Sequence, residues 1–97
     1  MGLIEEIKSG GMDEVDLLEY VTDNDIAVAI AAAESPAATE PVLDIAAQDK
    51  DRRVRIAALG NPNIGNETLG FLCGDADADI AKMAAELLGR RQDELVL

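Results

Sequence analysis

The sequence contains no histidine and only one cysteine, Cys73, among its 97 residues. Disulfide frameworks need cysteine pairs, and most zinc sites and many general bases are built from thiolate or imidazole groups. The composition therefore argues against a disulfide framework, a thiolate or imidazole metal site, and catalysis by a histidine base. We expect neither a cofactor nor an enzymatic activity from this set of side chains.

Long apolar runs and a basic leader are also missing. No apolar stretch reaches the roughly 18 residues that a membrane span requires. The first residues carry Glu5 and Glu6 where a signal peptide would be basic and then apolar. These features predict a cytoplasmic protein without a membrane segment.

Basic residues are scarce in the first half of the chain. Residues 1–49 hold twelve acids and one lysine, whereas residues 50–97 hold eight acids and seven bases, and the net charge is −12. An acidic surface repels phosphate groups, so its electrostatic interaction with nucleic acid or with an anionic membrane is unfavourable. We therefore expect neither as a partner.

What the chain does contain is a repeat, which appears when the sequence is shifted by 26 residues. The aligned sets are Leu17, Leu43 and Leu69; Val28, Val54 and Ile80; Asp23, Asp49 and Asp75; Asp25, Asp51 and Asp77; and the pair Pro36 and Pro62. Cys73 aligns with Val21 and Ala47, which predicts a core position for it. Several different residue types agree on one offset, so we interpret the repeat as real.

Each unit has the pattern of two short helices. Apolar residues recur at spacings of three and four, as in Leu43, Ala46 and Ala47, and this spacing is typical of amphipathic helices. Acidic, hydroxyl or glycine residues stand where the helices should begin. The predicted N-caps are Asp13, Thr39 and Gly65 for the first helices, and Asp25, Asp51 and Asp77 for the second helices. The stretch Gly-Asn-Pro-Asn at 60–63 is then a corner between units.

The stretch VRIAALGNPNIGNETLGFLCGDADAD, residues 54–79, resembles the leucine-rich-repeat variant family, and VAIAAAESPAATEPVLDIAAQDKDRR matches more loosely. DKDRRVRIAAL is also similar to HEAT-like repeats, so the two classes stay open. The resemblance implies a right-handed superhelix in which α-helices alternate with shorter, partly 3₁₀ helices. Some family members carry a cysteine cluster for an iron–sulfur centre, but this chain has only Cys73, so that cofactor is not carried over.

Together these patterns predict an all-α fold, a short right-handed α-solenoid of about three 26-residue two-helix repeats, with roughly seven helices in all. We expect one domain, with an N-terminal cap at residues 1–12, repeats at 13–89 and a C-terminal tail at 90–97. The cap contains a short helix with Leu3, Ile4 and Ile7 on one side. Residues 95–97 are expected either to fold back or to fray.

Four acids have the spacing of positions 1, 3, 5 and 12 of a calcium-binding loop: Asp75, Asp77, Asp79 and Glu86. Position 6 of that template requires glycine for a sharp turn. Here it is Ile80, which occupies the core column of Val28 and Val54. We therefore interpret these acids as helix-capping residues and predict no metal site.

The segment KDRRVR, residues 50–55, concentrates Arg52, Arg53 and Arg55 in an acidic chain. The arginines either pair with the neighbouring aspartates or form a small patch that recognises carboxylates of a partner, since arginine offers a bidentate fork. We predict a protein-interaction module without catalytic activity, with these three arginines as the partner contact.

An alternative is an accessory subunit or small-ligand carrier of an enzyme system that uses carboxylates as acids and bases. A deep pocket with two inward acids of raised pKa would favour the alternative, and a shallow open face would favour the interaction module. The partner's identity and the oligomeric state stay open.

Overall fold

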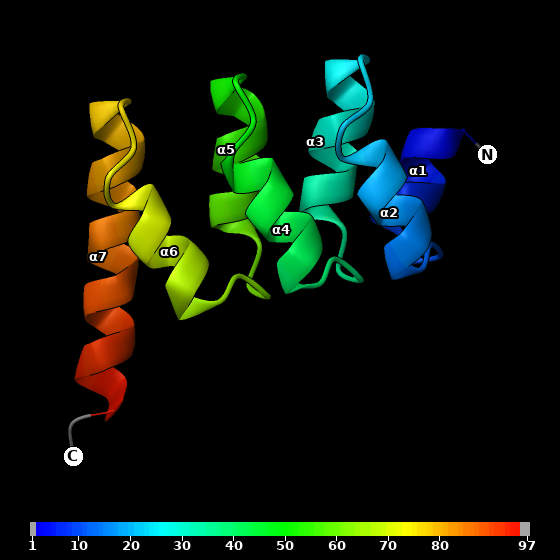
Figure 1. The fold of residues 1–97 in the computed structure, drawn as a ribbon. Helices are drawn as coiled ribbons and strands as arrows, with labels where there is room; N and C mark the ends of the chain where they lie inside the picture. The colour runs from blue at the N-terminus through cyan, green and yellow to red at the C-terminus, as the bar shows by residue number, and fades with distance from the viewer. Residues whose placement is uncertain (1, 96–97) are drawn as a thin grey trace.

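A computed structural model describes residues 2–95, with side chains described for residues 2–92, and every regular element within them is a helix (Figure 1). The seven helices are α1 (Leu3–Lys8), α2 (Glu14–Tyr20), α3 (Ile26–Glu34), α4 (Glu40–Ala47), α5 (Arg52–Gly60), α6 (Asn66–Leu72) and α7 (Ala78–Leu95). The all-α prediction is confirmed.

The helix starts keep the spacing found in the sequence. Helices α2, α4 and α6 begin at residues 14, 40 and 66, and α3, α5 and α7 begin at residues 26, 52 and 78. Asp25 caps α3 by accepting from the Ala27 N–H at 3.0 Å, and Asp51 caps α5 by accepting from the Arg53 N–H at 2.9 Å. Both bonds satisfy N–H groups that the first turn of a helix leaves free.

The starts of α2, α4 and α6 are not all capped by a side chain. The Asp13 carboxylate accepts from the Asp16 N–H at 3.0 Å, as expected. Thr39 and Gly65 occupy the N-cap positions of α4 and α6, but neither side chain makes a cap hydrogen bond. The Thr39 hydroxyl instead donates to a Glu14 carboxylate oxygen at 2.9 Å, joining the starts of α4 and α2.

The helices lie in pairs: α2 with α3, α4 with α5, and α6 with α7 (Figure 1). Successive pairs contact one another through α3, α5 and α7 in one layer and through α2, α4 and α6 in the other. Helix α1 packs against α3 at the N-terminal end. The assembly extends over 44 × 29 × 18 Å.

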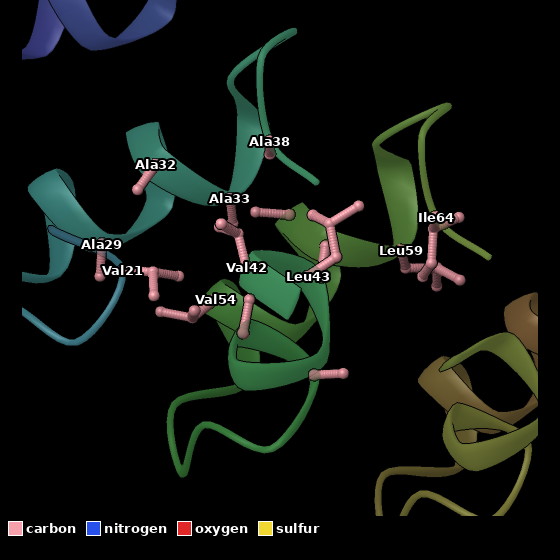
Figure 2. Packing of buried hydrophobic residues seen from close by; sticks show 14 of the residues in the cluster. Val21, Ala29, Ala32, Ala33, Ala38, Val42, Leu43, Val54, Leu59 and Ile64 are labelled. Atoms are coloured by element: carbon pink, nitrogen blue, oxygen red, sulfur yellow. The ribbon is translucent and has the colours of Figure 1, made fainter. Parts of the chain in front are cut away.

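The core runs between the two layers. Leu17, Leu43 and Leu69 are each fully buried, which confirms the leucine column as core. Figure 2 shows Leu43 close to other buried side chains of the central helices. Cys73 is only partly buried and packs at the edge of this cluster. Burial of these side chains is the main favourable contribution to folding.

The two ends of the molecule have features of their own. Ile7 of α1 is fully buried and Ile4 packs against the core, whereas Leu3 is exposed. Gly10 follows with φ of 84°, a conformation that glycine adopts without steric cost. It lets the chain turn from α1 toward α2.

At the other end, α7 continues through residues 90–95, which the sequence placed in a tail. Two features favour this extension: Leu87 and Leu88 pack against the core, and the Arg91 guanidinium donates to the Ile64 carbonyl at 2.7 Å. Residues 96 and 97, expected to fold back or fray, lie outside the described residues. Among the described helices, none combines the length and apolarity needed to cross a bilayer.

Candidate functional site

The structure brings the three predicted arginines onto one ridge at the start of α5, where each meets an aspartate. Arg52 Nε lies 2.6 Å from an Asp77 carboxylate oxygen, and Arg53 Nη2 lies 2.8 Å from an Asp51 oxygen. Arg55 Nε lies 2.9 Å from an Asp75 oxygen. We call this group the Asp/Arg ridge; its members are Asp49, Asp51, Asp75, Asp77, Arg52, Arg53 and Arg55. The partner-binding role of the arginines stays a prediction.

The three arginines differ in how much of the side chain faces solvent. Arg52 is 50% exposed and Arg53 is 63% exposed, whereas Arg55 is 16% exposed and its partner Asp75 only 6%. Arg55 also donates to the Asp49 carbonyl at 2.8 Å. Arg55 therefore joins the loop before α5 to the loop before α7, and its guanidinium is already occupied.

The arginine–aspartate pairs of the Asp/Arg ridge stabilise the charged forms of their side chains. A hydrogen bond from Arg53 is the main cause that lowers the pKa of Asp51 from 3.8 to about 2. The hydrogen bond from Arg52 likewise lowers the pKa of Asp77, and these partners raise the pKa of both arginines. Carboxylates of a partner would have to compete with aspartates that are already in place.

The acids of the calcium-loop spacing make bonds within the protein. The Asp75 carboxylate accepts from the Asp77 N–H at 2.8 Å, and the Asp77 carboxylate accepts from the Asp79 N–H at 3.0 Å. Asp77 also accepts from the Ile80 N–H at 3.3 Å, so it caps α7. Over the described part of the chain, no group of three or more His, Cys, Asp or Glu side chains is placed to hold a metal ion.

The Gly-Asn-Pro-Asn stretch is a corner whose asparagines bind the preceding helix pair. The Asn61 amide, almost fully buried, donates to the carbonyls of Ala33 and Ser35, both at 2.9 Å. The Asn63 amide donates to the carbonyls of Pro36 at 2.9 Å and Ala38 at 3.0 Å. Sequence reasoning located the corner but missed these bonds. The sequence offered one signal: the positions of the first unit that align with Asn61 and Asn63 are serine and alanine, so the two asparagines are not part of the shared pattern.

A second surface, which the sequence analysis missed, lies on the outer side of α2, α4 and α6; we call it the α2/α4/α6 face. Val15 is 74% exposed, Phe71 59% and Ile45 37%, although all three are large apolar residues. Ile45 and Phe71 occupy equivalent positions, 26 residues apart, on neighbouring helices. The sequence signal for this face was an apolar residue at the same position of two units, outside the set of positions expected to be buried.

An open hollow of about 460 Å³ adjoins Phe71. It lies where α4 and α6 end, beside the Asp/Arg ridge. Its lining consists of Ala47, Gln48, Asp49, Arg55, Phe71, Gly74, Asp75 and Ala76. The hollow thus combines an exposed aromatic ring with polar groups that are mostly bonded to each other.

Comparison with known proteins does not add a function to this geometry. The chain matches no protein-family model, no curated protein and no solved structure.

Proposed function

We propose that this chain is a protein-interaction module built as a short right-handed α-solenoid of about three two-helix repeats with an N-terminal cap. The 26-residue spacing of six helix starts supports the repeat interpretation. So does the recurrence of aspartate caps at Asp25, Asp51 and Asp77. The resemblance to leucine-rich-repeat variant and HEAT-like units is part of this proposal.

The observation that carries the function is the exposure of Val15, Ile45 and Phe71 on one layer of neighbouring helices. Single exposed apolar residues are common on protein surfaces and need no explanation. Here they lie on three helices of one layer, in which α4 contacts both α2 and α6. Other apolar side chains of the same helices are buried in the core. Stacked helices of this kind present an extended surface to a protein partner.

The alternative, an accessory subunit or ligand carrier that uses carboxylates, has less support. It requires an enclosed pocket and carboxyls whose pKa is raised. The hollow beside Phe71 is open, and the pKa values of Asp51 and Asp77 move downward. The geometry favours binding over acid–base chemistry.

Arg52 and Arg53 keep a place in the proposal as contacts for acidic groups of a partner, because about half or more of each side chain faces solvent. Arg55 drops to a structural role, since it is largely buried between two loops. We place the module in the cytoplasm, and we propose protein and not nucleic acid or membrane as its partner, in line with the net charge of −12.

The test is affinity capture from the native host with the wild type, Phe71→Ser, Arg52→Gln/Arg53→Gln, and the control Lys82→Ser on exposed α7. We expect an identified partner that rebinds in purified form at one-to-one stoichiometry, is lost with Phe71→Ser and is retained with Lys82→Ser. If only the arginine variant lost the partner, the binding site would lie on the Asp/Arg ridge and not at Phe71. If no purified protein rebinds any form of the chain, the proposed function is wrong.

A further inference from the structure

We propose that the α2/α4/α6 face binds a basic segment of a partner protein, one in which lysines or arginines flank apolar side chains. This inference rests on the proposed function and deepens it, because it names the chemistry of the partner. It follows from three properties of the face: its charge of one sign, its exposed apolar side chains and the hollow beside them.

Charge is divided between the two helix layers. Helices α2, α4 and α6 contain no lysine or arginine, and their acids are Glu14, Asp16, Glu19, Glu40, Asp44 and Glu67. In the other layer α3 has Glu34 alone, α5 carries three arginines and no acid, and α7 carries both signs. A surface with acids alone produces a uniform negative potential, which accelerates the approach of a basic partner and holds it.

Some acids of this face are available for such a partner, although Glu14 and Asp44 each accept a hydrogen bond from a threonine hydroxyl. The ion pairs found in the described part of the chain all join α5 arginines to aspartates of the ridge loops or the start of α7. Glu19 and Glu67 are exposed, on α2 and α6 respectively. No base within the described part of the chain neutralises the charges of these two glutamates.

The apolar side chains give the partner a place to dock. Phe71 lies between Gly70 and Gly74, which add no side chains beside its ring. It borders the hollow of about 460 Å³, which has room for an apolar side chain of the partner. An exposed aromatic ring also attracts a lysine or arginine placed over its face.

A basic segment suits this face better than the other possible occupants. A second copy of the chain would bring two acidic faces together, and like charges in contact cost binding energy. An anionic membrane would be repelled for the same reason. A segment with both basic and apolar side chains satisfies the acids and covers Phe71 at once.

The experiment measures fluorescence anisotropy of a labelled synthetic peptide of about 14 residues, with leucine and lysine arranged at helical spacing. Two matched peptides serve as probe controls: one has glutamate in place of lysine, and the other has serine in place of leucine. Titrations at low and moderate salt separate local binding from diffuse attraction to an acidic protein.

Protein variants locate the site. Phe71→Ser should weaken the lysine/leucine peptide about tenfold, because it removes the central apolar contact. Glu19→Gln/Glu67→Gln should weaken it about threefold, whereas Glu34→Gln/Glu86→Gln, the same charge change on α3 and α7, should alter it less than about twofold. Unchanged thermal unfolding of Phe71→Ser confirms that its fold is intact; if that variant is destabilised, Val15→Ser replaces it.

Several results would overturn the inference. Equal weakening by both pairs of glutamine variants would show diffuse electrostatic attraction. Tight binding of the glutamate peptide that still depends on Phe71 would reject the basic partner and keep the interaction module. Self-association that Phe71→Ser abolishes would assign the face to a second copy. Failure of every peptide to bind would reject this inference alone, since the capture experiment tests the proposed function separately.

Discussion

The three helix pairs are joined by asparagine amide bonds at one junction and by arginine–aspartate ion pairs at the other, while a threonine–carboxylate bond occurs at both. At the first junction, between α2/α3 and α4/α5, the amides of Asn61 and Asn63 donate to backbone carbonyls of the preceding pair. At the second junction, between α4/α5 and α6/α7, Arg52 and Arg55 bind Asp77 and Asp75. The aligned positions for these arginines at the first junction are Ile26 and Ala29.

This difference shows that similar helix packing can be held by neutral or by charged groups. Neutral amide bonds in a buried corner respond little to salt or pH, whereas ion pairs at a partly exposed ridge respond to both. The two junctions should therefore be separable by solution conditions, although the helices on either side are alike.

The largest effect is expected where both junctions are broken at once. Leu43 is fully buried in α4, which contacts both α2 and α6. Leu43→Asp should unfold the domain, because an unpaired buried charge costs several kcal/mol against a total stability of about 5–10 kcal/mol. Circular dichroism during thermal unfolding measures this, with Ile45→Asp on the exposed side of α4 as the control. A cooperative melt at the wild-type temperature for Leu43→Asp would contradict it.

Arg55→Ala should break the second junction alone. It leaves the buried Asp75 carboxylate without its cation, and we expect a loss of about 3 kcal/mol in the free energy of unfolding. The control is Arg53→Ala, whose pair lies within the start of α5 and is more exposed, so its loss in the free energy of unfolding should be clearly smaller. Urea unfolding gives both values. Equal losses for the two variants would mean that burial of the pair does not matter.

Asn61→Ala should weaken the first junction by about 2 kcal/mol, because the buried carbonyls of Ala33 and Ser35 lose their donor. The more exposed Asn63→Ala should cost less. Repeating the urea experiment at high salt sharpens the comparison: the effect of Asn61→Ala should stay constant, while that of Arg55→Ala should shrink. A salt-dependent Asn61→Ala effect would show that the Asn61 hydrogen bonds are coupled to charged groups.

The smallest effect concerns pH at the ridge. The folded pKa of Asp51 is about 2 against an ordinary value of 3.8, and that of Asp77 is also lowered. A carboxyl group whose pKa is lowered in the folded state stabilises the protein at pH values above its ordinary pKa. This contribution is lost as the pH falls through the folded pKa. Wild type should therefore lose more stability between pH 3.8 and about 2 than Arg52→Gln/Arg53→Gln does.

Chemical unfolding across this pH range measures the slope for both proteins. Asn61→Ala is the control, because it removes only neutral hydrogen bonds and should follow the wild-type slope. Parallel curves for wild type and the arginine variant would contradict the proposed role of these pairs. At neutral pH the arginine variant should melt within a few degrees of wild type, since exposed pairs stabilise little.

The sequence predicted local features such as helix caps better than it predicted contacts between helix pairs. The aspartate caps at Asp25 and Asp51 were predictable because an N-cap acts on the next two or three residues of the same chain. Thr39 was placed correctly at a helix start, but its bond to Glu14 depends on how α4 lies against α2. A single sequence carries no direct information on that arrangement.

The candidate sites show the same limit. Pairing of Arg52, Arg53 and Arg55 with nearby aspartates was one of two interpretations, and only the structure separates the buried Arg55 from its exposed neighbours. Phe71 was not singled out, because an apolar residue in an amphipathic helix is expected to face the core. Exposure depends on which helices stack beside it, and periodicity alone does not decide that.

The side-chain bonds that join successive helix pairs have a consequence for how fast the chain folds. Those at Asn61, Arg52 and Arg55 connect residues only 20 to 28 positions apart. Closing such short loops costs little entropy, and proteins dominated by nearby contacts fold quickly. Each junction joins neighbouring helix pairs, so neither one requires the two ends of the chain to meet first.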